Sequence, residues 1–205
     1  MKKQTLLVIG LAALLASATQ ASQEQLAQSI RDAQLETTRT STQLKSTLGV
    51  LNALTAQKKG DLRPAYTAFC TELPKTEAAA GLTRTRVQWM AGDGRKYFQD
   101  WQKTIDGIAN ESLRKKAQKR MDAVKKSYDK VEASLVQAGE KFRPFLSDLT
   151  DIQKFLATDV TAGGVKAIKS TVSSANWNLQ FVDKSTKDAL KEMDKMQKAL
   201  SSEAK

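Results

Sequence analysis

Asp148 and Asp151 are the residues in this sequence that come nearest to a catalytic pair. Two carboxylates can act as general acid and general base, as they do in glycosidases. Their spacing of three places them on one side of a helix, but the same spacing is common on solvated helix faces, and we favour that interpretation. The chain contains no histidine, which removes the usual general base near neutral pH and excludes Ser-His-Asp and Cys-His arrangements. We therefore predict that the protein is not an enzyme.

Metal and cofactor chemistry also lack their usual residues. Without histidine, and with Cys70 as the one cysteine, zinc loses its common ligands. The glycines of Ala91-Gly92-Asp93-Gly94 follow no strand pattern, so they indicate a helix interruption and not a phosphate-binding loop. Cys70 lies beside Phe69 on an apolar stripe, where a thiol packs as a small hydrophobic group, and pairing between chains is the alternative. We predict no metal and no cofactor.

The highest local charge lies in a segment that has no acidic residue from 112 to 121. Its cations, which we call the basic segment, are Arg114, Lys115, Lys116, Lys119 and Arg120. Neighbouring like charges cost helix stability, so an anion that compensates them is one explanation for the segment. A solvated basic face, paired with acids on neighbouring helices, is the other explanation. The basic segment is the candidate anion-binding site of this sequence.

The three tryptophans divide into two kinds. Trp101 continues the apolar stripe of its helix, so we expect it in the core. Trp89 and Trp177 fall off their stripes. Such residues either mark a partner surface or an interfacial anchor, or are buried by a second neighbouring helix.

The first 21 residues have the order of a secretory signal peptide. Two lysines at positions 2 and 3 precede an apolar run from Leu6 to Leu15, and small residues then offer cleavage after Ala18 or Ala21. The run is too short to cross a bilayer, which takes about 20 apolar residues. No cysteine follows it, so lipidation is not supported. We predict cleavage near Ala21, a fall in net charge from +11 to +9 with the loss of two lysines, and a periplasmic or secreted mature protein.

Apolar residues at three- and four-residue spacing predict helices throughout the rest of the chain, and no segment alternates as a strand does. The helices are expected from about Ser22 to Gln57, from Asp61 to Ile108, from Asn110 or Ser112 to Leu156, and from Val165 to Leu200. Lys58-Lys59-Gly60 suits a helix end, and Asp61 suits the N-cap that follows. Pro74 and Gly92-Asp93-Gly94 are weak points of the second helix, although its stripe continues beyond them. Pro144 should bend the third helix.

The stripes give the predicted core and the fold class. In chain order they are Leu26, Ile30, Ala33, Leu44, Leu48, Leu51 and Leu54; Tyr66, Phe69, Leu73, Ala80, Val87, Met90, Tyr97, Trp101, Ile105 and Ile108; Leu113, Ala117, Met121, Val124, Tyr128, Val131, Leu135, Ala138, Phe142, Leu146, Leu149, Ile152 and Leu156; and Val165, Ile168, Val172, Leu179, Val182, Leu190, Met193 and Leu200. Short connections between long helices force antiparallel neighbours. We predict an all-α fold in which residues 22–205 form one elongated, coiled-coil-like antiparallel bundle of about four long helices.

Several short motifs resemble a known family. They are Phe98-Gln99-Asp100-Trp101, Ser112-Leu113-Arg114, Tyr128, Lys141-Phe142-Arg143-Pro144-Phe145-Leu146, Phe155-Leu156, and the stretch from Ala162 to Ile168. With them the chain resembles a bacterial group of exported, coiled-coil-rich proteins that is catalogued as a domain of unknown function. The likeness covers nearly all of the mature chain, although Thr158-Asp159 stands where the family has a His-Asn pair. The resemblance implies a helical architecture and export, and it implies no known activity.

Two functions fit these observations. The first is a non-enzymatic envelope protein that acts by helix-face contacts with another protein or with a second copy. The second is a peripheral binder of anionic envelope surfaces, phospholipid or lipopolysaccharide, through the basic segment. Nucleic acid is not expected as a partner in the predicted compartment.

Overall fold

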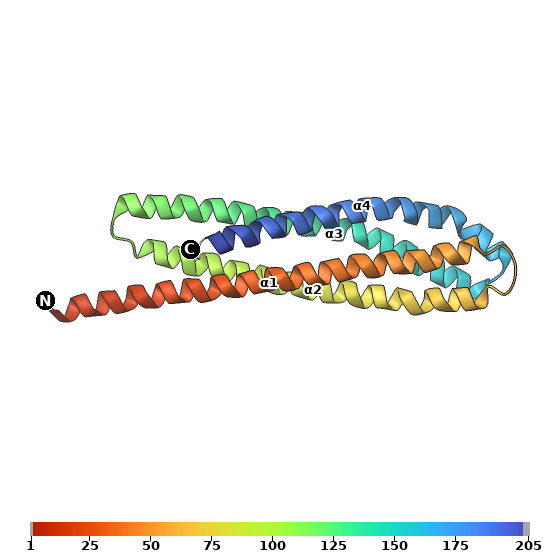
Figure 1. Ribbon diagram of the computed structural model, residues 1–205, viewed down its shortest axis with the longest axis horizontal. Coiled ribbons are helices and arrows are strands. Elements are labelled where there is room, and N and C mark those ends of the chain that lie inside the picture. The colour runs from red at the N-terminus through yellow and green to blue at the C-terminus, as the bar shows by residue number, and fades with distance from the viewer. Residues whose placement is uncertain (1, 203–205) are drawn as a thin grey trace. The chain divides into compact units, whose positions relative to one another are not determined.

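Four long α-helices make up the protein in the computed structural model, which describes the backbone of residues 2–202 and the side chains of 17–201. Figure 1 shows their order: α1 (Lys2–Ala56), α2 (Arg63–Asp106), α3 (Glu111–Thr158) and α4 (Ala162–Ser202). Residues 2–202 contain no strand. The predicted all-α fold with four helices is therefore confirmed.

The connections are short, and polar side chains cap the helices that follow them. Gly60 has a φ of 93°, the left-handed conformation expected after α1. The Asp61 carboxylate accepts a hydrogen bond from the Arg63 backbone N–H at 3.0 Å. Asn110 caps α3 by accepting from the Leu113 N–H at 3.0 Å, which decides between the two predicted caps. Thr161 caps α4 by accepting from the Gly164 N–H at 3.2 Å.

The start of the first helix differs from our expectation. We expected a helix from about Ser22, whereas α1 begins at Lys2. The reason is local: between the apolar run and Ser22 the sequence has no proline or glycine to end a helix, and alanine is the best helix former. The side chains of residues 1–16, which include the predicted apolar leader run, lie outside the described part.

α2 is continuous through both of its predicted weak points, Pro74 and Gly92-Asp93-Gly94. At Gly94 the glycine is required by packing, because the ring of Tyr128 from α3 occupies the space beside it. A Cβ on Gly94 would lie 2.9 Å from Cε1 of Tyr128 and closer still to Cζ and the hydroxyl. α3 likewise continues through Pro144.

The helices pack in two compact units, and each helix contributes to both. Unit 1 comprises Met1–Gln34, Arg86–Ala133 and Lys191–Lys205, and unit 2 comprises Leu35–Thr85 and Ser134–Leu190. Within each unit the contacts run antiparallel. In unit 2, for example, Asn52 and Asn176 exchange amide hydrogen bonds at 2.9 and 2.8 Å, and seven residues earlier on α1 Lys45 pairs with Asp183 of α4 at 2.5 Å.

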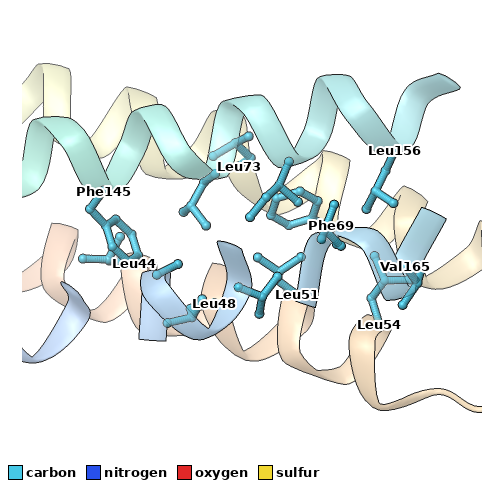
Figure 2. Packing of buried hydrophobic residues seen from close by; sticks show 14 of the residues in the cluster. Leu44, Leu48, Leu51, Leu54, Phe69, Leu73, Phe145, Leu156 and Val165 are labelled. Carbon is cyan, nitrogen blue, oxygen red and sulfur yellow. The ribbon is translucent and has the colours of Figure 1, made fainter. Parts of the chain in front are cut away.

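The core of unit 2 is built from the predicted stripes of all four helices. Figure 2 shows its leucines from α1, Phe69 and Leu73 from α2, Phe145 and Leu156 from α3, and Val165 from α4 pointing into a common interior. A polar layer interrupts the α1 stripe at Thr37 and Thr40. There the Thr40 hydroxyl shares a hydrogen bond with that of Thr83 at 2.9 Å, and two turns later the buried hydroxyls of Thr47 and Thr76 are 2.8 Å apart.

Unit 1 is packed around aromatic rings. Tyr97 is fully buried and lies 5.1 Å from Phe98 between ring centroids, and Phe98 meets the ring of Tyr128 edge-on at 5.5 Å. The Tyr128 hydroxyl donates to the Met90 carbonyl across α2 and α3. Trp101, predicted as a core residue, is half-buried against Tyr97.

Candidate functional site

The basic segment occupies the first turns of α3, and all five of its cations are exposed. Lys115 pairs with Glu111 at 2.7 Å, one turn earlier on the same helix. Within residues 17–201, Arg114, Lys116 and Lys119 form no ion pair. The structure therefore brings three unpaired cations together on one turn and a half of helix, about 8 Å of axis, which is within a Debye length at physiological salt.

Leu113 lies at the edge of the basic segment and corrects one of our predictions. We expected it in the core, but its side chain is 55% exposed. In unit 1 a hydrogen bond from Lys195 and, with a smaller effect, the charge of Lys130 lower the pKa of Glu192. Lys130 of α3 is therefore near Glu192 of α4, and the two helices are neighbours at that level. Leu113 precedes Lys130 by 17 residues, whereas α4 ends at Ser202, only 10 residues beyond Glu192. The beginning of α3 therefore has no α4 beside it, and an apolar side chain stays uncovered among the cations.

Trp89 is exposed, as its off-stripe position allowed, and it borders an open groove between α1 and α2. The guanidinium of Arg86 stacks over its ring at 4.7 Å from the centroid and also approaches the Asp32 carboxylate at 3.5 Å. The groove has a volume of about 430 Å³, and Gln25 and Asp93 also line it, joined by a hydrogen bond of 3.5 Å. An aromatic face, a cation and two carboxylates therefore meet at one surface of unit 1.

Trp177 and Phe181 form a second exposed aromatic site, on α4 in unit 2. The side chain of Trp177 is 61% exposed and that of Phe181 45% exposed. Their rings meet edge-on with centroids 5.7 Å apart. Because they stand four residues apart on a helix, they share one side of α4. The off-stripe position of Trp177 allowed either exposure or burial by a second helix, and Phe181 was not singled out in the sequence.

Asp148 and Asp151, the carboxylates singled out in the sequence, both lie on α3, and Asp148 is half-buried. Asp151 is exposed and accepts a hydrogen bond from Lys154 at 3.3 Å, as residues of a solvated helix face do. Across residues 17–201 no three His, Cys, Asp or Glu side chains are grouped so that they could hold a metal ion. Cys70, the free thiol, is half-buried near Tyr66.

The perturbed pKa values have structural causes. Hydrogen bonds from Lys187 and then Lys45 lower the pKa of Asp183. A hydrogen bond from Lys96 does the same for the pKa of Asp100, against the effect of burial. Burial first, and the nearby Glu132 second, raise the pKa of the Tyr128 phenol. Ion pairs with lysines account for the shifts of the two carboxyl groups and burial for most of that of Tyr128, and none of the three groups lines the groove at Trp89.

These observations define an all-α protein of long antiparallel helices. Its distinctive surfaces are the basic segment at the start of α3, the groove at Trp89, and the exposed rings of Trp177 and Phe181. The chain belongs to the family described as "Protein of unknown function (DUF2959)", whose sequence profile matches residues 16–200. A comparison with curated proteins found no match. Among the described residues, no helix is long and apolar enough to cross a membrane.

Proposed function

We propose that this protein is an exported, non-enzymatic helical protein that acts by contacts of its helix faces with another envelope protein or with a second copy of itself. The observation that carries the proposal is the Trp89 groove. Tryptophan and arginine are the residues most enriched at the energetic centres of protein interfaces. Here Arg86 is already held over Trp89 by stacking and by Asp32, so little side-chain entropy remains to be lost on binding.

Export is supported by the leader pattern and by the extent of the family match. The matched region begins at residue 16, just after the apolar run from Leu6 to Leu15. This boundary leaves the apolar run outside the matched region and lies six residues before the predicted mature start at Ser22. Mass spectrometry of protein from the native host should find a chain that starts at Ser22 or Thr19, and a start at Met1 or Lys2 would refute the export proposal.

Site-specific photo-cross-linking tests the groove. A photoreactive side chain at Gln88, an exposed residue that lines the groove, should give a discrete cross-linked product in the native host. The same probe at Val136, an exposed position on α3 in unit 2, serves as the matched control. Trp89→Ser should abolish the product formed from position 88, because it removes the largest apolar contact of the groove.

The outcome separates the two kinds of partner. A product with twice the mass of the chain indicates self-association, and any other discrete mass indicates a different protein. If the probe at position 88 gives no more product than the probe at Val136, or if Trp89→Ser leaves the product unchanged, the groove is not a contact site.

The second candidate function is binding of an anionic envelope surface through the basic segment. It is favoured by the three unpaired cations and by Leu113, whose exposed side chain can enter an interface that the cations approach. Each cation near an anionic leaflet contributes about 1 kcal/mol. Replacing Lys115, Lys116 and Lys119 with glutamine removes three of these contributions and keeps the helix propensity.

Flotation with vesicles tests this second candidate. The parent protein should bind phosphatidylcholine vesicles that contain phosphatidylglycerol, should ignore phosphatidylcholine alone, and should be released by salt. The triple glutamine variant should bind much more weakly at low salt. Equal binding by parent and variant would identify the basic segment as a solvated face.

A further inference from the structure

Trp177 and Phe181 have no role in the core of unit 2. The other phenylalanines nearby, Phe69 and Phe145, are fully buried and hold the helices together. On α4 the buried side is defined by Val172, Ala175 and Val182. Trp177 stands two residues from Ala175, and a step of two residues turns about 200° around a helix. The aromatic pair therefore points away from the core, where packing in this chain does not explain it.

Positive charge prevails around the pair, although the exposed Asp188 follows Phe181 by seven residues and therefore lies on the same side of α4. No acidic residue occurs from 160 to 182. Lys166 precedes Trp177 by 11 residues and Lys184 follows it by seven, and both spacings return to nearly the same side of a helix. Both lysines are exposed. Asp183, the first acid after the pair, is held by Lys45 and Lys187 at 2.5 and 2.6 Å, so its charge is compensated. We call Lys166, Trp177, Phe181 and Lys184 the α4 aromatic face.

The area of the α4 aromatic face is too small for a stable dimer. Aromatic side chains bury about 150 to 250 Å² each, so exposed fractions of 61% and 45% offer roughly 200 Å² in all. A standard protein interface needs about 800 Å² from each partner. In a symmetric contact of two copies through this face, the lysines of one copy would also lie close to those of the other, and like charges repel. Binding to a bilayer surface needs neither a minimum protein area nor shape complementarity. The anionic headgroups also attract the lysines.

From this geometry we infer that the α4 aromatic face seats α4 flat on an anionic phospholipid surface, with Trp177 and Phe181 at headgroup depth and Lys166 and Lys184 among the lipid phosphates. Tryptophan is enriched at membrane interfaces because its ring is apolar and its N–H is polar, and lysine stems can lie along the interface while the ammonium reaches water or phosphate. This inference goes beyond the protein contact proposed at Trp89. It shares the anionic surface with the second candidate function but uses a different helix and a different unit.

Tryptophan fluorescence reports the predicted contact directly. The full chain is expressed in its native host, so that any processing takes place, and carries Trp89→Phe and Trp101→Phe so that Trp177 is the remaining tryptophan. Its emission should shift to shorter wavelength with vesicles of phosphatidylcholine and phosphatidylglycerol, and brominated lipids should quench it. No shift should occur with phosphatidylcholine alone.

Flotation of variants measures the contribution of the aromatic pair. Trp177→Ser with Phe181→Ser should lower the binding constant for the anionic vesicles by roughly tenfold or more. The matched control is Leu82→Ser with Val136→Ser, which removes two apolar side chains of similar exposure, 55% and 61%, from α2 and α3 of the same unit. The control should bind as the parent does, and both variants should keep the helical circular dichroism spectrum.

The outcomes separate the inference from the second candidate function. If Trp177 stays in water while the protein floats and the triple glutamine variant of the basic segment does not, the inference is overturned and the second candidate stands. If the aromatic variant loses binding while the glutamine variant keeps it, the inference stands alone. Absence of binding to any anionic vesicle overturns both. A sedimentation velocity change in the aromatic variant without lipid would show that a second copy covers the face, which also overturns the inference.

Discussion

Gly94→Ala should destabilise the protein, although alanine is the better helix former. In the middle of a helix, alanine is favoured over glycine by about 1 kcal/mol. At Gly94, however, the new methyl would overlap Cζ and the hydroxyl of Tyr128 and lie 2.9 Å from Cε1. The Tyr128 ring is buried and its hydroxyl donates to Met90, so it cannot move without opening the core or losing that bond.

The magnitude follows from these opposing effects. Overpacking a core by one methyl costs about 1 to 3 kcal/mol, and loss of the hydrogen bond to Met90 costs a further ~0.5 to 1.5 kcal/mol. After subtraction of the gain in helix propensity, the net destabilisation is about 0.5 to 3.5 kcal/mol. Gly81→Ala is the matched control on the same helix, because a Cβ there meets nothing within 4 Å. It should raise stability by up to ~1 kcal/mol.

Urea unfolding followed by circular dichroism measures both variants. A double-mutant cycle with Tyr128→Leu isolates the clash, because leucine has neither Cζ nor the hydroxyl. In that background Gly94→Ala should cost clearly less than in the parent. If Gly94→Ala is as stable as the parent, or if its cost is unchanged beside Leu at position 128, the packing of α2 on α3 is not as described.

Three further measurements test other parts of the structure. Leu135→Ala should cost about 2 to 5 kcal/mol because it empties a buried site, whereas Lys119→Ala should cost almost nothing; equal urea midpoints would contradict this. Burial and the neighbouring Cys70 raise the pKa of Tyr66 to about 12. Its contribution to stability is therefore complete below pH ~10 and is lost as the pH rises toward 12. In Tyr66→Phe the free energy of unfolding should fall less steeply over this pH range than in the parent. A chain that starts at Thr19 should be more stable by about 1 to 3 kcal/mol than one that starts at Ser22, because the Thr19 hydroxyl makes two hydrogen bonds to α2; equal midpoints would show that these bonds contribute nothing.

The core could be predicted from the sequence because burial in a helical protein follows one period. Every leucine of the predicted α1 stripe is buried, from Leu26 to Leu54. The weak part of that stripe, around Thr37 to Thr42, could be located but not explained. The partner of Thr40 in this part is Thr83, which is supplied by another helix, and the register between helices is not encoded in the period of either one.

The failure at Leu113 has a different cause. Periodicity shows which side of a helix faces its neighbours, but not where a neighbour ends. Leu113 stands on the core side of α3 and is exposed because α4 ends before reaching its level. The same limit explains Gly94, which looked like a weak point of a helix and is a close contact with Tyr128. In both cases the sequence lacked the position of the neighbouring helix: where α4 ends for Leu113, and how closely α3 approaches for Gly94.

The two exposed tryptophans show how far a candidate site could be predicted. Their off-stripe positions left two alternatives, exposure or burial by a second helix; the structure shows both tryptophans exposed. The sequence alone did not distinguish one from the other. The surroundings separate them. Trp89 has Arg86 on its ring and the carboxylates of Asp32 and Asp93 along its groove, which an anionic surface would repel and a protein with matched polar groups can satisfy. Trp177 has a second ring beside it and lies in a stretch, 160–182, that contains no acidic residue, so anionic headgroups meet no carboxylate of that stretch. We therefore propose two kinds of contact for one residue type. Salt should distinguish them, since added salt weakens the attraction of lysines to lipid while leaving a stacked Trp–Arg contact largely intact.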